Sequence, residues 1–162
     1  MGYNHVLRKL RYAFDYSGPQ MIEIFNNVNI DVSLEQVDAW LMKEHLDGFA
    51  EISNADMNSF LDGFIIKHRG KKDGQEIERN DFLDNNLVFR KVKIALSLKD
   101  TDIVELLSLS KFVMSKSEIN AFFRNPEHGK YRRCQDQVLR VFLQGVIKKN
   151  NPSENNENSI EE

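Results

Sequence analysis

The chain has 162 residues, of which 41% are hydrophobic and 29% charged, and its net charge is −3. These values predict a folded soluble protein, either one domain or two small repeats that share a core. No apolar run approaches the roughly 18 residues of a membrane span, and the polar start lacks a secretory apolar region. The single cysteine, Cys134, can form no internal disulfide, so we expect a cytoplasmic protein.

Apolar side chains recur at helical spacing through residues 1–68, which predicts a first unit of four helices. We expect Asn4 to cap the first helix, and the third to open with a capping-box pattern at Ser33. The first predicted helix begins at Asn4. The second covers residues 19–27 and the third 33–44, and the fourth begins at Asn54 or Asp56.

A polar, turn-rich connector follows at residues 69–85, and four more helices are predicted in residues 86–149. Asn86 is the expected cap of the first of these, the next two cover 101–109 and 115–125, and the last follows Cys134. Residues 150–162 have too little apolar content to fold, so we expect a disordered acidic tail.

The two predicted units are copies of each other. Residues 4–67 align without a gap onto 86–149 at a constant offset of 82, and thirteen of the 64 pairs are identical. Composition alone would give roughly four identities. The sequence therefore predicts an all-α protein made of two tandem four-helix repeats, related by a pseudo-two-fold and packed on a shared core.

Glycine is repeated inside the fourth helix, at Gly63 and Gly145, where it costs about 1 kcal/mol relative to alanine. Because bulky apolar residues flank both glycines, we expect close helix–helix approach across the interface between the copies, in preference to a ligand site.

The acidic residues Glu23 and Glu105 are also a repeated pair, and paired carboxylates can serve in acid–base catalysis. We favour a repeated salt bridge from the second helix to the first. The candidate cations are Arg8 and Arg90, or Lys9 and Lys91.

Charge separates the two copies. Residues 86–152 hold 13 basic and 6 acidic side chains, a balance of +7, whereas residues 153–162 carry −4. The second repeat is thus a basic unit in an acidic protein, which points to an anionic partner.

The second and third helices of each copy resemble a helix-turn-helix, although the intervening turn is longer than usual. In the first copy the positions that match the basic stripe hold Leu34, Asp38 and Met42. The candidate anion- or nucleic-acid-binding residues are Lys116, Asn120, Arg124, Lys130, Arg132 and Arg133.

Other site types find less support in the sequence. Cys134 follows two arginines that favour a thiolate, yet no base or oxyanion pocket is evident for a nucleophile, and a small buried residue is the preferred interpretation. No cofactor or metal is predicted, because the histidines lack metal-ligand spacing and read as solvated polar residues. These histidines are His5, His45, His68 and His128.

Three segments resemble the uncharacterised YehS-like bacterial family, which consists of two copies of a small domain of unknown function. They are the Asn-x-Val-x-Arg-Lys opening of each copy, the Ala-Trp-Leu-x-Lys-Glu stretch at 39–44, and the Tyr-Arg-x-Cys-x-Asp-Gln pattern that begins at 131. The resemblance covers about residues 3–149 and implies a bacterial cytoplasmic protein. It implies no activity, ligand or catalytic residue, and the tail lies outside it.

The sequence as a whole predicts a non-enzymatic binding or regulatory protein whose basic second repeat engages an anionic or protein partner. DNA or RNA binding by the helix-turn-helix-like segment is the alternative. A small enzyme that uses Cys134 or the repeated glutamates is the third. The partner is unknown, no membrane contact is expected, and the sequence does not indicate an oligomeric state.

Overall fold

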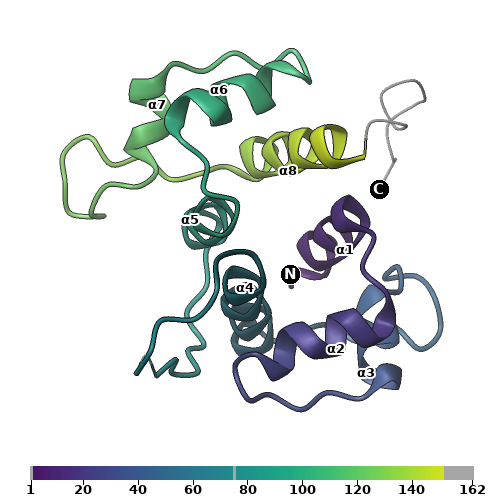
Figure 1. Cartoon of the computed structure of the whole chain (residues 1–162). Helices are drawn as coiled ribbons and strands as arrows, with labels where there is room; N and C mark the ends of the chain where they lie inside the picture. The colour runs from purple at the N-terminus through teal and green to yellow at the C-terminus, as the bar shows by residue number, and fades with distance from the viewer. Residues whose placement is uncertain (1, 75, 152–162) are drawn as a thin grey trace.

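The computed structural model describes residues 2–74 and 76–151, and every regular element within them is an α-helix. Each copy contributes four helices, as predicted (Figure 1). The first copy has α1 (Asn4–Phe14), α2 (Gly18–Asn26), α3 (Leu34–Leu41) and α4 (Asn54–Arg69). The second has α5 (Asn85–Ala95), α6 (Asp100–Ser108), α7 (Lys116–Ala121) and α8 (Asp136–Asn150).

Serine side chains cap several helix N-termini. Ser33 accepts a hydrogen bond from the Gln36 N–H at the start of α3, and Ser115 forms a complete capping box with Glu118 at α7. In this box the Ser115 N–H donates to Glu118 Oε1, and hydrogen bonding by the Ser115 backbone, followed by its side chain, lowers the pKa of Glu118. Ser17 and Ser53 cap α2 and α4 in the same way.

The expectation that Asn4 and Asn86 cap their helices is wrong. Tyr3 precedes α1 without a side-chain cap, and Asp84 caps α5. The two asparagines are instead almost fully buried, with 2% and 7% of their surface exposed. Their hydrogen-bond partners are backbone groups at the end of the third helix of their own copy and in the long loop that follows it.

The two copies pack through exchanged contacts between first and fourth helices. The most extensive helix pairs are α4 with α5 and α1 with α8, so the first helix of each copy lies against the fourth helix of the other (Figure 1). The buried apolar side chains of both copies form a single cluster. Within it Phe89 stacks on Phe142 with their ring centroids 4.1 Å apart. The predicted shared core and pseudo-two-fold arrangement are confirmed.

The repeated glycines permit close helix approach, but inside each copy and not across the interface as predicted. A Cβ built on Gly63 of α4 would fall 1.9 Å from the carbonyl oxygen of Ile24 in α2. One built on Gly145 of α8 would fall 2.4 Å from the carbonyl oxygen of Leu106 in α6. Because Ile24 and Leu106 are themselves 82 residues apart, both copies contain the same contact.

The predicted salt bridge from Glu23 and Glu105 to the first helix is wrong. Both carboxylates are exposed, and neither makes an ion pair within residues 2–74 and 76–151. Lys91 instead crosses between the copies: its Nζ lies 2.7 Å from Asp62 Oδ1 and 2.8 Å from Asn58 Oδ1, both on α4. The ion pair therefore ties α5 to α4.

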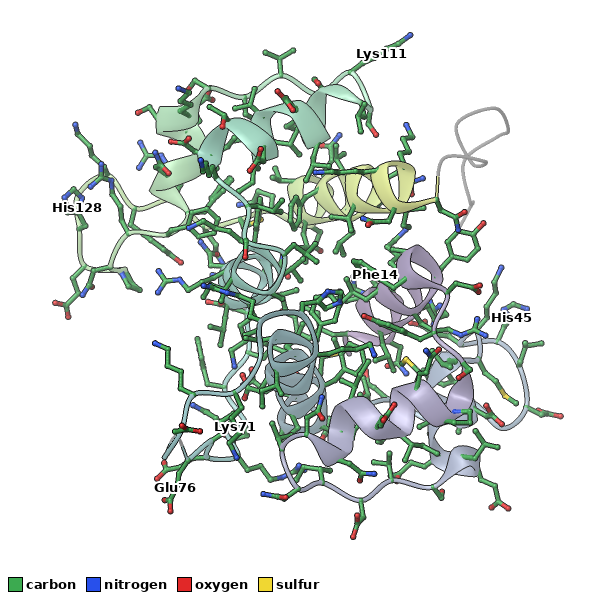
Figure 2. All side chains as sticks on the ribbon, viewed as in Figure 1. Phe14, His45, Lys71, Glu76, Lys111 and His128 are labelled. Carbon is green, nitrogen blue, oxygen red and sulfur yellow. The ribbon has the colours of Figure 1, made fainter. Side chains whose placement is uncertain are left out.

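The third helices are shorter than predicted, because α3 ends at Leu41 and α7 at Ala121. Loops of about a dozen residues lead from them to α4 and α8, and Figure 2 shows His45 and His128 on these loops at opposite sides of the molecule. None of the helices described has the length and apolar character to cross a membrane. The predicted disordered tail, residues 150–162, begins too early, because Asn150 is the last residue of α8; residues 152–162 lie outside the described residues.

Candidate functional site

All six predicted site residues are exposed, and they lie on α7 and the loop that follows it. Lys116 and Asn120 belong to α7 and Arg124 lies just beyond its end, whereas Lys130, Arg132 and Arg133 belong to the loop. The six residues span positions 116 to 133 of the second copy.

The side chain of Asn86 fixes this loop. Its Nδ2 donates to the carbonyl oxygens of Phe122 (3.1 Å) and Arg132 (2.9 Å), and its Oδ1 accepts from the Cys134 N–H (2.9 Å). The Arg132 N–H also donates to the Ala121 carbonyl, at 3.1 Å. Both ends of the loop are therefore held at α5, and Arg132 stands beside the end of α7.

Two further cations, missed by the sequence analysis, extend the site from α5. Arg90 Nη2 donates to the Phe123 carbonyl at 2.5 Å, and Lys93 Nζ lies 4.5 Å from the centre of the Phe123 ring. We name Arg90, Lys93, Arg124 and Arg132 the basic corner. The only sequence signal for this extension is that Arg90 is a repeated residue and Lys93 lies three positions later on the same helix.

The α7 end of the predicted stripe is less basic. The Asn120 Nδ2 donates to Asp100 Oδ2 at 3.3 Å, and Glu118 is held in the capping box. The helix itself has six residues and is separated from α6 by seven. The structure thus places Arg132 beside the end of α7, and it places carboxylates next to Lys116 and Asn120.

The first copy has the same hydrogen bonds between its asparagine and the loop, which we call the shared frame, but it lacks the arginines. Asn4 bonds the carbonyls of Trp40 and Ala50 and the N–H of Ile52, which are the residues 82 positions before those bonded by Asn86. Arg8 donates to the Met42 carbonyl at 3.2 Å, much as Arg90 donates to Phe123. Where the second copy has Arg124, Arg132 and Arg133, the first has Met42, Ala50 and Glu51.

Cys134 is not an activated thiol. The residue is 2% exposed, and burial, aided by Asp136 and Asp84, raises its pKa to about 12. A thiol of that pKa stays protonated at neutral pH, and its backbone N–H serves the Asn86 hydrogen bond. The predicted burial of Cys134 is confirmed.

His45, His68 and His128 are exposed, as expected, and His5 is half-buried, but the exposed His68 also packs against neighbouring rings. His68 packs edge-on against Phe64, with centroids 4.5 Å apart, and its Nε2 is 2.7 Å from the Tyr16 hydroxyl. Burial, with a smaller contribution from Lys67, lowers the pKa of His68. Across residues 2–74 and 76–151, no three histidine, cysteine or carboxylate side chains are grouped so as to hold a metal ion.

Comparison with known proteins agrees with the internal repeat. The model of a family described as "Protein of unknown function (DUF1456)" matches twice, at residues 3–70 and 85–151. The chain is also similar to the "Uncharacterized protein YehS" of Escherichia coli (strain K12), with 37% identity over 144 residues, which cover 88% of this chain and 92% of that protein. No solved structure matches. The two matched segments coincide with the two four-helix copies, and the chain belongs to the DUF1456 family.

Proposed function

We propose that the chain is a non-enzymatic binding protein whose basic corner holds an acidic segment of a partner protein. The observation that carries this proposal is the difference between the copies. Arg90 and Arg8 occupy equivalent places in the shared frame, but Arg124 and Arg132 are added only in the second copy. Exposed cations that do not support the fold are available to bind anions.

The chemistry of the surroundings favours a protein partner over a nucleic acid. Carboxylates at Asp100, Glu118 and Glu127 flank the predicted stripe and would repel a continuous row of phosphates. The six-residue α7 offers little length for a recognition helix, and the amide of Asn120 is engaged by Asp100. The partly buried ring of Phe123 adds apolar surface beside the cations, which suits a peptide.

A charge-reversal pair tests the proposal. The Arg124→Glu/Arg132→Glu double variant is compared with Lys71→Glu/Lys72→Glu, which makes the same charge change on the exposed connector. In a pull-down from the source cell, we expect the corner variant to lose a protein that the wild type and the connector variant retain. In binding measurements with that protein, reversal should weaken affinity by about tenfold or more.

Nuclease treatment separates the two macromolecular partners. Capture that disappears after nuclease treatment would favour the nucleic-acid alternative, in which affinity also falls steeply with salt. Equal capture by the corner and connector variants would remove the basic corner from consideration.

A further inference from the structure

A groove of about 940 Å³ lies between α1 and α8. It is separate from the basic corner, and both copies line it. The loop after α3 closes one of its sides. Its charged side chains are four fixed cations and two carboxylates, in addition to His5 and His45. They are Arg8, Lys9, Lys43 and Arg140, and Glu44 and Asp136.

The pseudo-two-fold relates this groove to the contact of α4 with α5, and there the equivalent place is filled. The chain leaving α4 folds back along that helix before entering α5. The Nδ2 of Asn58 donates to the carbonyl oxygens of Asn80 (3.1 Å) and Phe82 (2.7 Å), and Arg79 pairs with Asp56 at 2.6 Å. Figure 2 shows Lys71 and Glu76 on this returning segment.

The middle of the returning segment contacts the second half of α4. Glu76, Ile77 and Glu78 enclose a small cavity with Asp62 and Ile65 of that helix. The segment therefore runs antiparallel to α4, with residues 76–78 beside the later turns and 79–82 beside the earlier turns.

We propose that the acidic tail, residues 152–162, returns along α8 in the same manner and occupies the groove between α1 and α8. The tail follows α8 as the connector follows α4, and residues 151–162 lie 82 positions after 69–80. Asn58, which holds the connector, corresponds to Arg140, and Asp62, which lines the cavity beside residues 76–78, corresponds to Gln144; Arg140 and Gln144 both line the groove.

The charge of the segment that follows the fourth helix is reversed in the second copy. Arg79 of the connector, which pairs with Asp56 on α4, corresponds to Glu161 of the tail, whereas the α8 residue that corresponds to Asp56 is the neutral Val138. On α8 the groove carries Arg140, and the end of the tail carries Glu161 and Glu162. Ile160, the one apolar residue of segment 153–162, stands next to these glutamates, as Ile77 stands near Arg79.

The tail is long enough to make this contact. Arg140 lies about 15 Å back along α8 from its end at Asn150, at 1.5 Å per helical residue. An extended segment of the tail's length spans about 35 Å, so its last residues reach the groove with slack. Covalent attachment supplies an effective concentration of about a millimolar, at which a few charge pairs and one isoleucine suffice.

Paramagnetic NMR on the full chain tests the proposal. A nitroxide is attached to position 159 in the Ser159→Cys variant, and buried Cys134 does not compete for the label. We expect broadening of backbone amides at α8 residues 140–144 and at the facing turns of α1. The broadening should fade at high salt, because exposed charge pairs are screened.

Three variants of the labelled protein decide the outcome. Arg140→Glu should abolish the local broadening, and Lys72→Glu, the same change at an exposed connector site, should leave it intact. Adding Glu161→Arg and Glu162→Arg to Arg140→Glu should restore it. Broadening spread evenly over the surface, centred on the basic corner, or unaltered by Arg140→Glu would overturn the proposal.

Discussion

Replacing Gly63 by alanine should destabilise the protein, although the same change usually stabilises an exposed helix by about 1 kcal/mol. The new Cβ would lie 1.9 Å from the Ile24 carbonyl oxygen and 2.8 Å from its carbonyl carbon. Because these are backbone atoms of α2, no side-chain rotation relieves the contact. Helix α2 must move away from α4 by more than about 1 Å to restore an ordinary contact distance.

The cost follows from what α2 buries. Met21, Ile24 and Phe25 are completely buried, and each contributes about 2 kcal/mol by leaving water. A gap of about 1 Å forfeits a quarter to a half of the packing attraction, or about 1.5–3 kcal/mol for the three. Overpacking strain adds about 1–3 kcal/mol, and the helix-propensity gain returns about 1. We expect a net loss of about 3 kcal/mol for Gly63→Ala and about 2 for Gly145→Ala, whose clash is milder.

Urea unfolding followed by tryptophan fluorescence measures this loss. Trp40 is 3% exposed and its ring centroid lies 5.5 Å from that of Phe25, so it reports on the core that α2 enters. Gly129→Ala is the matched control, because nothing lies within 4 Å of a Cβ there. That variant should stay within about 0.5 kcal/mol of the wild type. A Gly63→Ala protein as stable as the control would refute the reasoning.

Three further outcomes are expected. Asn86→Ala removes three hydrogen bonds to the loop before α8 and should cost about 3 kcal/mol, with faster amide exchange confined at first to that loop; uniform exchange would contradict this. Because the pKa of Cys134 is raised to about 12, its thiol should react with a disulfide reagent at pH 8 only as fast as the protein opens, so that urea accelerates labelling. The lowered pKa of His68 makes the unfolded chain bind its proton more readily, so stability should be full above about pH 6.5 and decline as pH falls through and below it. More than a third of His68 is exposed, which keeps the effect small, and His68→Gln should flatten it.

The helices and their grouping could be predicted because their signals are local or repeated. Helical spacing of apolar residues needs only neighbouring positions, and serine caps act within three residues, as Ser33 and Ser115 do. The duplication then supplied the long-range information, since one gapless offset implies that both units fold alike. Helix ends were less predictable. The third helix of the second copy was expected to reach residue 125, but α7 ends at Ala121, and Asn86 binds the carbonyl of Phe122 directly after it.

Side chains with distant partners could not be assigned from the sequence. Asn4 and Asn86 stand where caps are expected, and only the fold brings a loop 36 to 48 residues later against them. Likewise, a glycine in a helix indicates close approach, but the identity of the neighbour depends on the order in which helices pack. Gly63 meets the helix two elements earlier in its own copy. Only two residues of the basic corner, Arg124 and Arg132, could be predicted from the sequence. Arg90 and Lys93 join them through tertiary contacts.

The duplication also indicates where function has diverged. Positions that build the frame keep their partners in both copies: the asparagine bonds and the glycine-to-carbonyl contacts recur at the same offset. An exposed arginine that is present in only one copy is not required by these shared contacts, since the other copy folds without it. Met42 against Arg124 marks the basic corner, and Asn58 against Arg140 marks the groove between α1 and α8. Each copy thus serves as the structural control for the other. Binding experiments should therefore begin with substitutions at Arg124 and Arg140, which are the charged members of these two pairs.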